Sequence, residues 1–171
     1  MSKLFKCFVL VVAIILGVYF MYIRYFSISD GERAPDFDTA LIDGAAFKLS
    51  DLQGKYVLLD FWGSWCGPCL KEIPELVELH QKHPDKLIIV TIALEKDSFS
   101  WKKVASKYGF TWKNQIVDQN KFVMMSSIAR KYGVTEIPAK FLISPEGKLI
   151  GRRSFKQIYS LFSVKSNSLR E

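Results

Sequence analysis

The sequence LDFWGSWCGPC at residues 59–69 places two cysteines just after an apolar run. The near-continuous apolar segment Tyr56–Trp62 predicts a strand in the middle of a sheet that is covered on both faces. An apolar stripe predicts a helix from about Pro68 to Gln81. Cys66 and Cys69 therefore fall where a buried strand turns into the start of a helix.

This position gives the two cysteines different chemistry. At a helix N-terminus, free N–H groups and the helix dipole favour the thiolate form of Cys66. Cys69 follows one turn later on the same face, where it is shielded from solvent. The spacing lets the two sulfurs form a disulfide and exchange two electrons through a mixed disulfide. We expect Cys66 to be the exposed nucleophile and Cys69 the resolving thiol, with Gly67 and Pro68 forming the turn.

The same cysteines also fit a zinc site. Cys66, Cys69, His80 and His83 follow a finger-like spacing. Zinc needs four ligands in one small tetrahedron, whereas Cys69 and His80 would stand about 16 Å apart along a single helix. The strand-to-helix context favours redox chemistry instead, and we expect both histidines at the surface near the helix end. The remaining cysteine, Cys7, is expected to be passive.

Patterns on either side of this segment predict the other elements of an α/β fold. A small hairpin is expected within residues 37–49, with Asp43-Gly44 as its turn. A helix capped by Ser98 or Ser100 should run to Tyr108. Further strands are expected at residues 87–94, 115–117, 140–144 and 149–153, and further helices at 122–132 and 154–162. This order predicts one mixed sheet with helices on both faces.

The apolar residues are unevenly distributed, because Cys7–Ile23 contains no charge. As a helix this segment would be about 26 Å long, close to the bilayer hydrocarbon core of about 30 Å, and it can be extended to residue 4. Lys3 and Lys6 precede it, which predicts a single transmembrane helix with its N-terminus in the cytoplasm and the bulk of the chain outside. A signal peptide cleaved near Ser29 is the alternative.

Length and composition limit the domain organisation and the class of protein. Its 171 residues should form an anchor at 1–26, a tether at 27–34 and one folded domain at 35–171. The 13 Phe, 7 Tyr and 4 Trp exclude a disordered chain, and 3 Cys are too few for a small disulfide-stapled protein. The 24 Lys and Arg are dispersed, so the net charge of +7 does not indicate a nucleic-acid-binding surface.

Together with their neighbours, these residues resemble the thioredoxin family. Residues 59–69 resemble its active-site segment, and Pro74 matches the proline that bends its active-site helix. Residues 129–138 (ARKYGVTEIP) resemble the segment that ends in the family's cis-proline, and residues 144–148 (SPEGK) resemble the hairpin after it.

Three further features narrow the resemblance to membrane-tethered thioredoxins of the TlpA/ResA type. They are the sequence APDF at residues 34–37, the lead-in at residues 49–55, and the single N-terminal apolar segment. The resemblance covers about residues 34–153, and residues 98–122 would be the central insertion of this subgroup.

The resemblance implies roles for several residues. Pro138 matches the cis-proline that packs beside the disulfide, with an ordinary trans loop proline as the alternative. Asp60 matches the buried carboxylate that handles the proton of the deeper thiol; otherwise it faces a polar gap. Glu95 resembles an acid that lines the active-site cavity, although a strand-end Glu is usually exposed. Ala139-Lys140 departs from the Thr-Thr pair that is common there, so different substrate contacts are expected.

The resemblance also implies which residues surround the substrate. The expected substrate contacts are Trp65, Gly67, Pro68 and Ile137, with Trp65 as a lid or docking surface. Trp62 is expected in the core.

The function that follows is thiol–disulfide exchange outside the cytoplasm without a bound cofactor. By resemblance, the reaction is reductive, with oxidised protein thiols such as those of apocytochrome c as substrates and a membrane electron carrier as redox partner. One alternative is a peroxiredoxin-type peroxidase, which would need a peroxidatic cysteine in a threonine-containing loop. The other is a metal chaperone that uses Cys66 and Cys69 as soft ligands.

Overall fold

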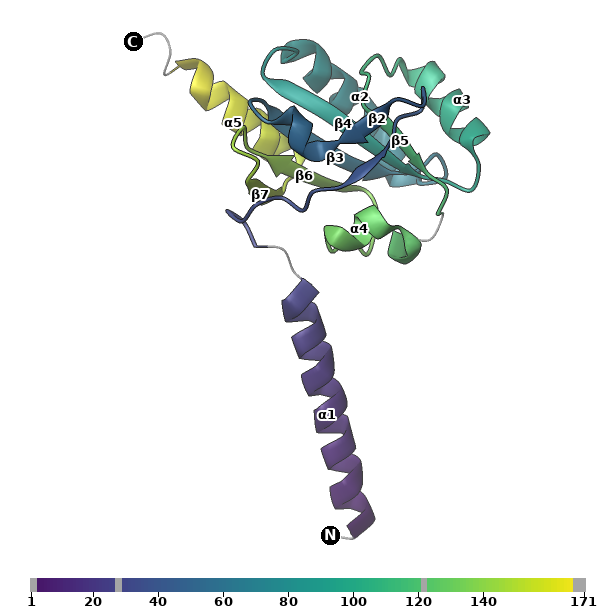
Figure 1. Ribbon diagram of the computed structural model, residues 1–171, viewed down its shortest axis with the longest axis vertical. Coiled ribbons are helices and arrows are strands. Elements are labelled where there is room, and N and C mark those ends of the chain that lie inside the picture. The colour runs from purple at the N-terminus through teal and green to yellow at the C-terminus, as the bar shows by residue number, and fades with distance from the viewer. Residues whose placement is uncertain (1–2, 27–28, 121–122, 168–171) are drawn as a thin grey trace.

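The computed structural model describes residues 3–26, 29–120 and 123–167 (Figure 1). The central sheet has five strands in the order β5-β4-β3-β6-β7, and a two-stranded sheet pairs β1 with β2. The strands are β1 (Asp38–Ala40), β2 (Ala46–Lys48), β3 (Tyr56–Trp62), β4 (Leu87–Leu94), β5 (Gln115–Asp118), β6 (Ala139–Ile143) and β7 (Leu149–Arg152). β3, β4 and β5 are parallel, whereas β6 and β7 pair antiparallel, so the sheet is mixed as predicted.

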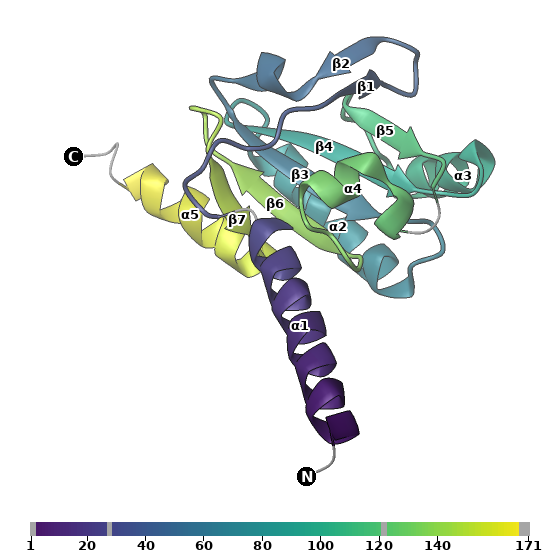
Figure 2. The same ribbon diagram turned by 60° about the horizontal axis from the view of Figure 1, so that its bottom comes forward.

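Helices cover both faces of this sheet. They are α2 (Gly67–Lys82), α3 (Ser98–Tyr108), α4 (Ser127–Lys131) and α5 (Phe155–Asn167), with short 3-10 turns η1 (Leu49–Leu52) and η2 (Val123–Met125). Figure 2 shows α4 on the near side of the sheet and α2 behind it. A buried strand covered on both faces needs an almost continuous apolar run, and β3 has one.

Alternation along β3 decides which side chains face which layer. Leu59 and Phe61 pack with the core that includes α4 and the N-terminal hairpin. Leu58 packs on the opposite face with side chains of α2 and α5. Asp60 has the same parity as Leu58, so the one acid in this strand faces the layer that contains α2.

Several predicted elements are confirmed. The bounds of β3 and β4 are those expected, and the hairpin turns at Gly44, which has a φ of 83°. α3 runs to Tyr108, but its N-cap was predicted wrongly. Asp97 caps it instead, by accepting hydrogen bonds from the N–H groups of Phe99 and Ser100. Asp97 precedes the two predicted serines, by one residue for Ser98 and by three for Ser100.

The helix expected over residues 122–132 is also corrected. α4 covers only Ser127–Lys131, and η2 precedes it; residue 122 lies outside the described residues. The Ser126 side chain accepts a hydrogen bond from the N–H of Ala129 at 3.0 Å. A serine cap in this position starts a new helix rather than continuing an older one.

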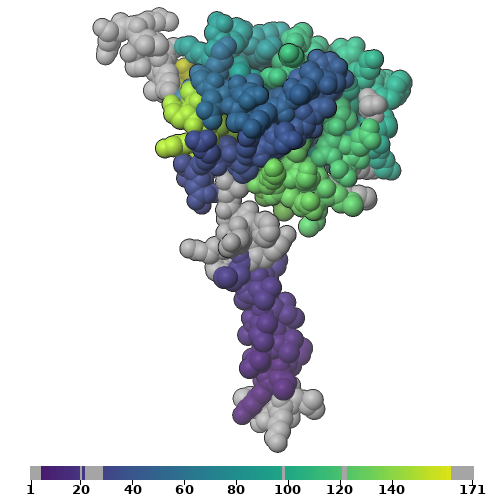
Figure 3. Space-filling model, viewed as in Figure 1, coloured from purple at the N-terminus to yellow at the C-terminus, as the bar shows by residue number. Residues whose placement is uncertain are grey.

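The N-terminal segment forms the helix α1 (Lys3–Phe26), which extends away from the domain (Figures 1 and 3). Its apolar side chains, such as Phe8, Leu10 and Ile14, are exposed. Among the described residues, however, no helix has both the length and the hydropathy needed to cross a membrane. The predicted transmembrane helix is therefore not supported.

Candidate functional site

The two cysteines form a disulfide at the start of α2. The sulfur–sulfur distance is 2.08 Å and the Cα–Cα distance is 5.2 Å. Cys66 is the N-cap residue of the helix, and its Sγ accepts a hydrogen bond from the N–H of Cys69 at 3.2 Å. Pro68 lies in the first turn, where its missing N–H leaves no bond unmade. After reduction, this N–H and the helix dipole would stabilise a thiolate at Cys66.

The expectation of an exposed Cys66 is wrong for the disulfide form. Cys66 is 6% exposed and Cys69 is 3% exposed. The Cys66 sulfur lies 3.8 Å from the carbonyl oxygen of Ile137, and the Ile137–Pro138 bond is cis, as the resemblance implied. The loop before β6 therefore lies against the disulfide, and Gly67, the residue after Cys66, is exposed.

The two tryptophans before the disulfide differ in exposure. Trp62 is buried against the ring of Phe110, at a centroid distance of 5.3 Å. Trp65 is 46% exposed, and its Nε1 donates a hydrogen bond to the backbone oxygen of Leu94 at 2.7 Å. Pro68 is exposed and Ile137 is half-buried. The predicted substrate contacts thus surround the disulfide, and Trp65 presents a large apolar face to a partner.

Asp60 is buried one layer below the disulfide. Burial raises the pKa of its carboxyl, while the ammonium group of Lys140 opposes this effect. Asp60 Oδ1 lies 3.4 Å from Lys140 Nζ. Asp60 and Cys69 line the same narrow space, so the acid that the resemblance indicated does face the deeper cysteine.

Glu72 was not singled out from the sequence, and Lys140 was noted there only as part of the departure from the usual Thr-Thr pair. Lys140 lies directly opposite Asp60 in the β3–β6 register, and its ammonium group also pairs with the Glu72 carboxylate. Its side chain is only 7% exposed. One signal was present: a lysine among the apolar residues of β6 needs a buried partner, because an isolated charge is costly to bury.

Glu95 lies on the other side of the cysteine turn. It is buried, with 1% exposure, and its carboxylate accepts hydrogen bonds from the N–H and the hydroxyl of Ser64. Burial raises the pKa of Glu95, and the two Ser64 bonds oppose that rise. The alternative of an ordinary exposed glutamate is therefore wrong; Glu95 fixes the turn between β3 and α2.

The histidines at the end of α2 pack on aromatic rings. His80 contacts Trp112 and His83 stacks on Phe162, at centroid distances of 5.4 and 4.9 Å. Burial lowers the pKa of both imidazoles. Over the described ranges, no three His, Cys, Asp or Glu side chains are grouped as metal ligands.

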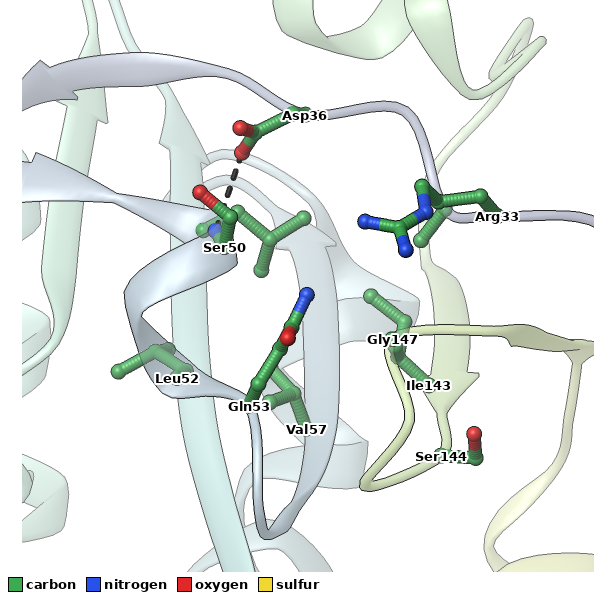
Figure 4. Close-up of a pocket in the computed structure, with 11 residues that line it drawn as sticks. Arg33, Asp36, Ser50, Leu52, Gln53, Val57, Ile143, Ser144 and Gly147 are labelled. Carbon is green, nitrogen blue, oxygen red and sulfur yellow. Dashed lines mark hydrogen bonds between the residues drawn. The ribbon is translucent and has the colours of Figure 1, made fainter.

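A separate cavity of about 160 Å³ lies at the opposite end of β3 (Figure 4). Val57, from the start of that strand, and Ile143, from the end of β6, line it, and Arg33 and Gln53 stand around its opening. The cysteines follow the other end of β3, so this cavity does not belong to the disulfide site.

The fold and the site define the class of thioredoxin-like thiol–disulfide oxidoreductases. A mixed five-stranded sheet carries a Cys-x-x-Cys disulfide at a helix start beside a cis-proline. Residues 31–152 match the model of the AhpC/TSA family. The chain therefore belongs to the AhpC/TSA family.

Individual relatives agree with this class. Thiol-disulfide oxidoreductase ResA of Bacillus thuringiensis is 34% identical over 121 residues, covering 70% of this chain and 66% of that protein. ResA of Bacillus cereus is 32% identical over 149 residues, covering 83% of each chain. The solved structure of a putative thiol:disulfide interchange protein DsbE from Chlorobium tepidum has a TM-score of 0.66 at 30% identity, covering 74% of this chain and 86% of that one.

Proposed function

We propose that the chain reduces disulfides of protein substrates outside the cytoplasm. The observation that carries this proposal is the Cys66–Cys69 disulfide at the start of α2, with exposed Trp65 beside it and buried Asp60 beneath it. The relatives named ResA and DsbE support the chemistry of disulfide exchange. The reducing direction rests on the resemblance to membrane-tethered thioredoxins.

The reaction starts from the dithiol form of the protein. The Cys66 thiolate attacks one sulfur of the substrate disulfide, and the other substrate sulfur leaves as a thiolate. Cys69 then loses its proton to a buried carboxylate, for which Asp60 is placed, and its sulfur attacks the Cys66 sulfur of the mixed disulfide. The second substrate sulfur leaves, so the substrate becomes a dithiol while Cys66 and Cys69 become a disulfide.

We also propose that α1 holds the domain at the cytoplasmic membrane. The apolar side chains of α1, including Phe8 and Ile14, are exposed, and within the described residues none of them belongs to a hydrophobic core cluster of the domain. Lys3 and Lys6 at its start favour a cytoplasmic N-terminus. A membrane electron carrier would then reduce the disulfide back to the dithiol, because the domain would work outside the cytoplasm.

A peroxidase reaction fits the site less well, although the family model covers the domain. It would need a peroxidatic cysteine in a threonine-containing loop. Here Trp65 and Gly67 flank Cys66, and its sulfur is already bonded to the Cys69 sulfur.

Trapping of mixed disulfides tests the proposed function. Cys69→Ala in the host cell should accumulate covalent complexes that dithiothreitol releases, because the mixed disulfide then has no resolving thiol. Cys66→Ala is the matched control and should trap nothing. The parent protein should be mainly a dithiol in growing cells. A mainly oxidised parent, with trapped partners that are reduced exported proteins, would show that the protein is an oxidant.

A further inference from the structure

Lys140 occupies the centre of a buried charge cluster next to the disulfide. Its ammonium nitrogen lies 3.4 Å from Asp60 Oδ1, pairs with the Glu72 carboxylate, and stands 4.7 Å from the centre of the Phe155 ring. β6 supplies the lysine, β3 and α2 supply the two acids, and α5 supplies the ring. A lysine with two carboxylate partners and an aromatic face is held in one place.

This cluster borders the deeper cysteine. Asp60, Glu72, Lys140 and Cys69 all line one narrow space that has no room for a water molecule. The side chains that line this space are therefore the nearest acceptors for the proton of Cys69. An ammonium group has no free electron pair, which leaves the carboxylates of Asp60 and Glu72 as acceptors, and Lys140 contacts both.

The two carboxylates are not equivalent. The Asp60 side chain is 7% exposed, whereas that of Glu72 is 39% exposed and reaches an outer groove. A buried carboxyl without a nearby cation would hold its proton and could not accept another. Lys140 thus stands where its positive charge lowers the pKa of the buried Asp60 carboxyl and opposes the effect of burial.

We propose that Lys140 is a positioning residue for the exchange reaction, because its ammonium group, shared between Asp60 and Glu72, keeps Asp60 as the carboxylate that accepts the proton of Cys69. The inference rests on the proposed disulfide exchange. The proton moves from Cys69 sulfur to Asp60 oxygen, the Cys69–Cys66 bond forms, and the Cys66–substrate bond breaks.

Other charges near the cluster are already paired. Arg152 and Arg153 line the outer groove with Glu72 and Lys140. Arg152 pairs with Glu136 at 3.7 Å, and Arg153 pairs with Asp30 at 3.0 Å. Lys140 is thus the cation that contacts both acids of the space, and the Glu72 charge opposes it by raising the pKa of Asp60.

The electrostatic arrangement predicts opposite effects for two variants of the full chain. Lys140→Met should move the pH midpoint of the exchange rate upward and lower the rate at pH 7 about tenfold. Glu72→Gln should move that midpoint downward, because the charge that disfavours ionised Asp60 is removed. Lys140→Arg keeps the charge and should stay near the parent. Lys107→Met, an exposed lysine on α3, controls for the loss of one charge.

Two measurements read out the effect. Stopped-flow tryptophan fluorescence gives the rate at which the dithiol protein reduces bis(2-hydroxyethyl) disulfide from pH 5 to 10, and ¹³C NMR of labelled aspartate gives the Asp60 titration directly. The double variant Asp60→Asn with Lys140→Met should exchange no more slowly than Asp60→Asn alone, because both substitutions act through the same carboxylate. An unmoved Asp60 titration in folded Lys140→Met would overturn the proposal. A tenfold loss of exchange rate in Glu72→Gln, with no loss in Asp60→Asn, would also overturn the proposal.

These measurements separate the inference from the proposed function. The reduction of bis(2-hydroxyethyl) disulfide needs no protein substrate. If the parent fails to reduce protein disulfides while the Lys140 and Glu72 variants still shift the Asp60 titration in opposite directions, the proposed substrate class is wrong and the role of Lys140 stands.

Discussion

Cys66 carries the chemistry because its sulfur caps a helix. Its Sγ accepts the N–H of Cys69 and lies at the positive end of the α2 dipole. After reduction, iodoacetamide should label Cys66 first, with a rate midpoint below the value of about 8.5 for a free thiol. Cys7→Ser removes the exposed third thiol beforehand, and peptide mass mapping identifies the labelled site. Faster labelling of Cys69 would contradict this assignment.

Asp60 should make stability depend on pH. Burial raises its folded-state pKa above its unfolded value of about 3.9. Its stabilising contribution is therefore complete below that unfolded value and is lost as pH rises through the folded pKa. Asp60→Asn does not titrate, so it should be more stable than the parent at neutral pH.

Urea unfolding of the oxidised proteins between pH 3 and 9 measures this difference. The gain of Asp60→Asn over the parent should be smallest at low pH and grow with pH until the folded carboxyl has ionised. Parallel stability curves for the two proteins would show that Asp60 has the same pKa in both states.

At the residue scale, local spacing predicted the cysteine pair but could not predict the charge cluster. Cys66 and Cys69 are three positions apart, so a helix start alone brings their sulfurs together. Lys140 lies 80 positions from Asp60, and only the register of β6 against β3 sets them opposite each other. Glu95 was recognised by resemblance, yet its hydrogen bonds to Ser64 depend on how the turn folds back onto β4.

At the scale of elements, the turn between β3 and α2 is fixed by close packing around Gly63. A Cβ added there would stand 2.8 Å from Trp65 Nε1 and 3.1 Å from the Leu94 oxygen that this nitrogen contacts. Gly63→Ala should therefore displace the Trp65 ring and cost about 1–3 kcal/mol of unfolding free energy.

Gly67→Ala is the matched control for stability, because nothing lies within 4 Å of its added Cβ. Urea unfolding gives the free energies, and the tryptophan emission of the oxidised protein reports the Trp65 environment. If the stability and the emission of Gly63→Ala were unchanged, the turn would be able to accommodate the added methyl group without loss of stability.

Strong periodic segments were predictable as elements, and weakly marked ones were not. β3 and β4 are buried on both faces, so each strand begins and ends where its apolar run begins and ends. The segment before α4 is divided by a Ser126 cap, which a helical pattern over residues 122–132 conceals. Alternation along β3 also explains why Asp60 faces the layer that contains α2, on the same side as Leu58.

At the scale of the whole molecule, the disulfide site and α1 are separate parts of the chain. The C-terminal end of β3 leads to the disulfide, whereas α1 extends from the domain as a separate apolar helix (Figure 1). A reductase of exported proteins must keep its disulfide outside the cytoplasm and still receive electrons from the membrane. The position of the domain relative to the membrane is therefore part of the proposed reaction.

Residues 27–171 should be exposed on the outer side of the cytoplasmic membrane. We expect this because lipid would cover the apolar surface of α1 and because the two lysines at its start favour the cytoplasmic side. Protease added to intact spheroplasts should digest the domain, and carbonate washing should leave the undigested protein with the membranes. A variant that lacks residues 1–26 should stay inside and resist the protease until lysis. Full protection of the parent before lysis would place the domain in the cytoplasm, and release by carbonate would remove α1 as its attachment.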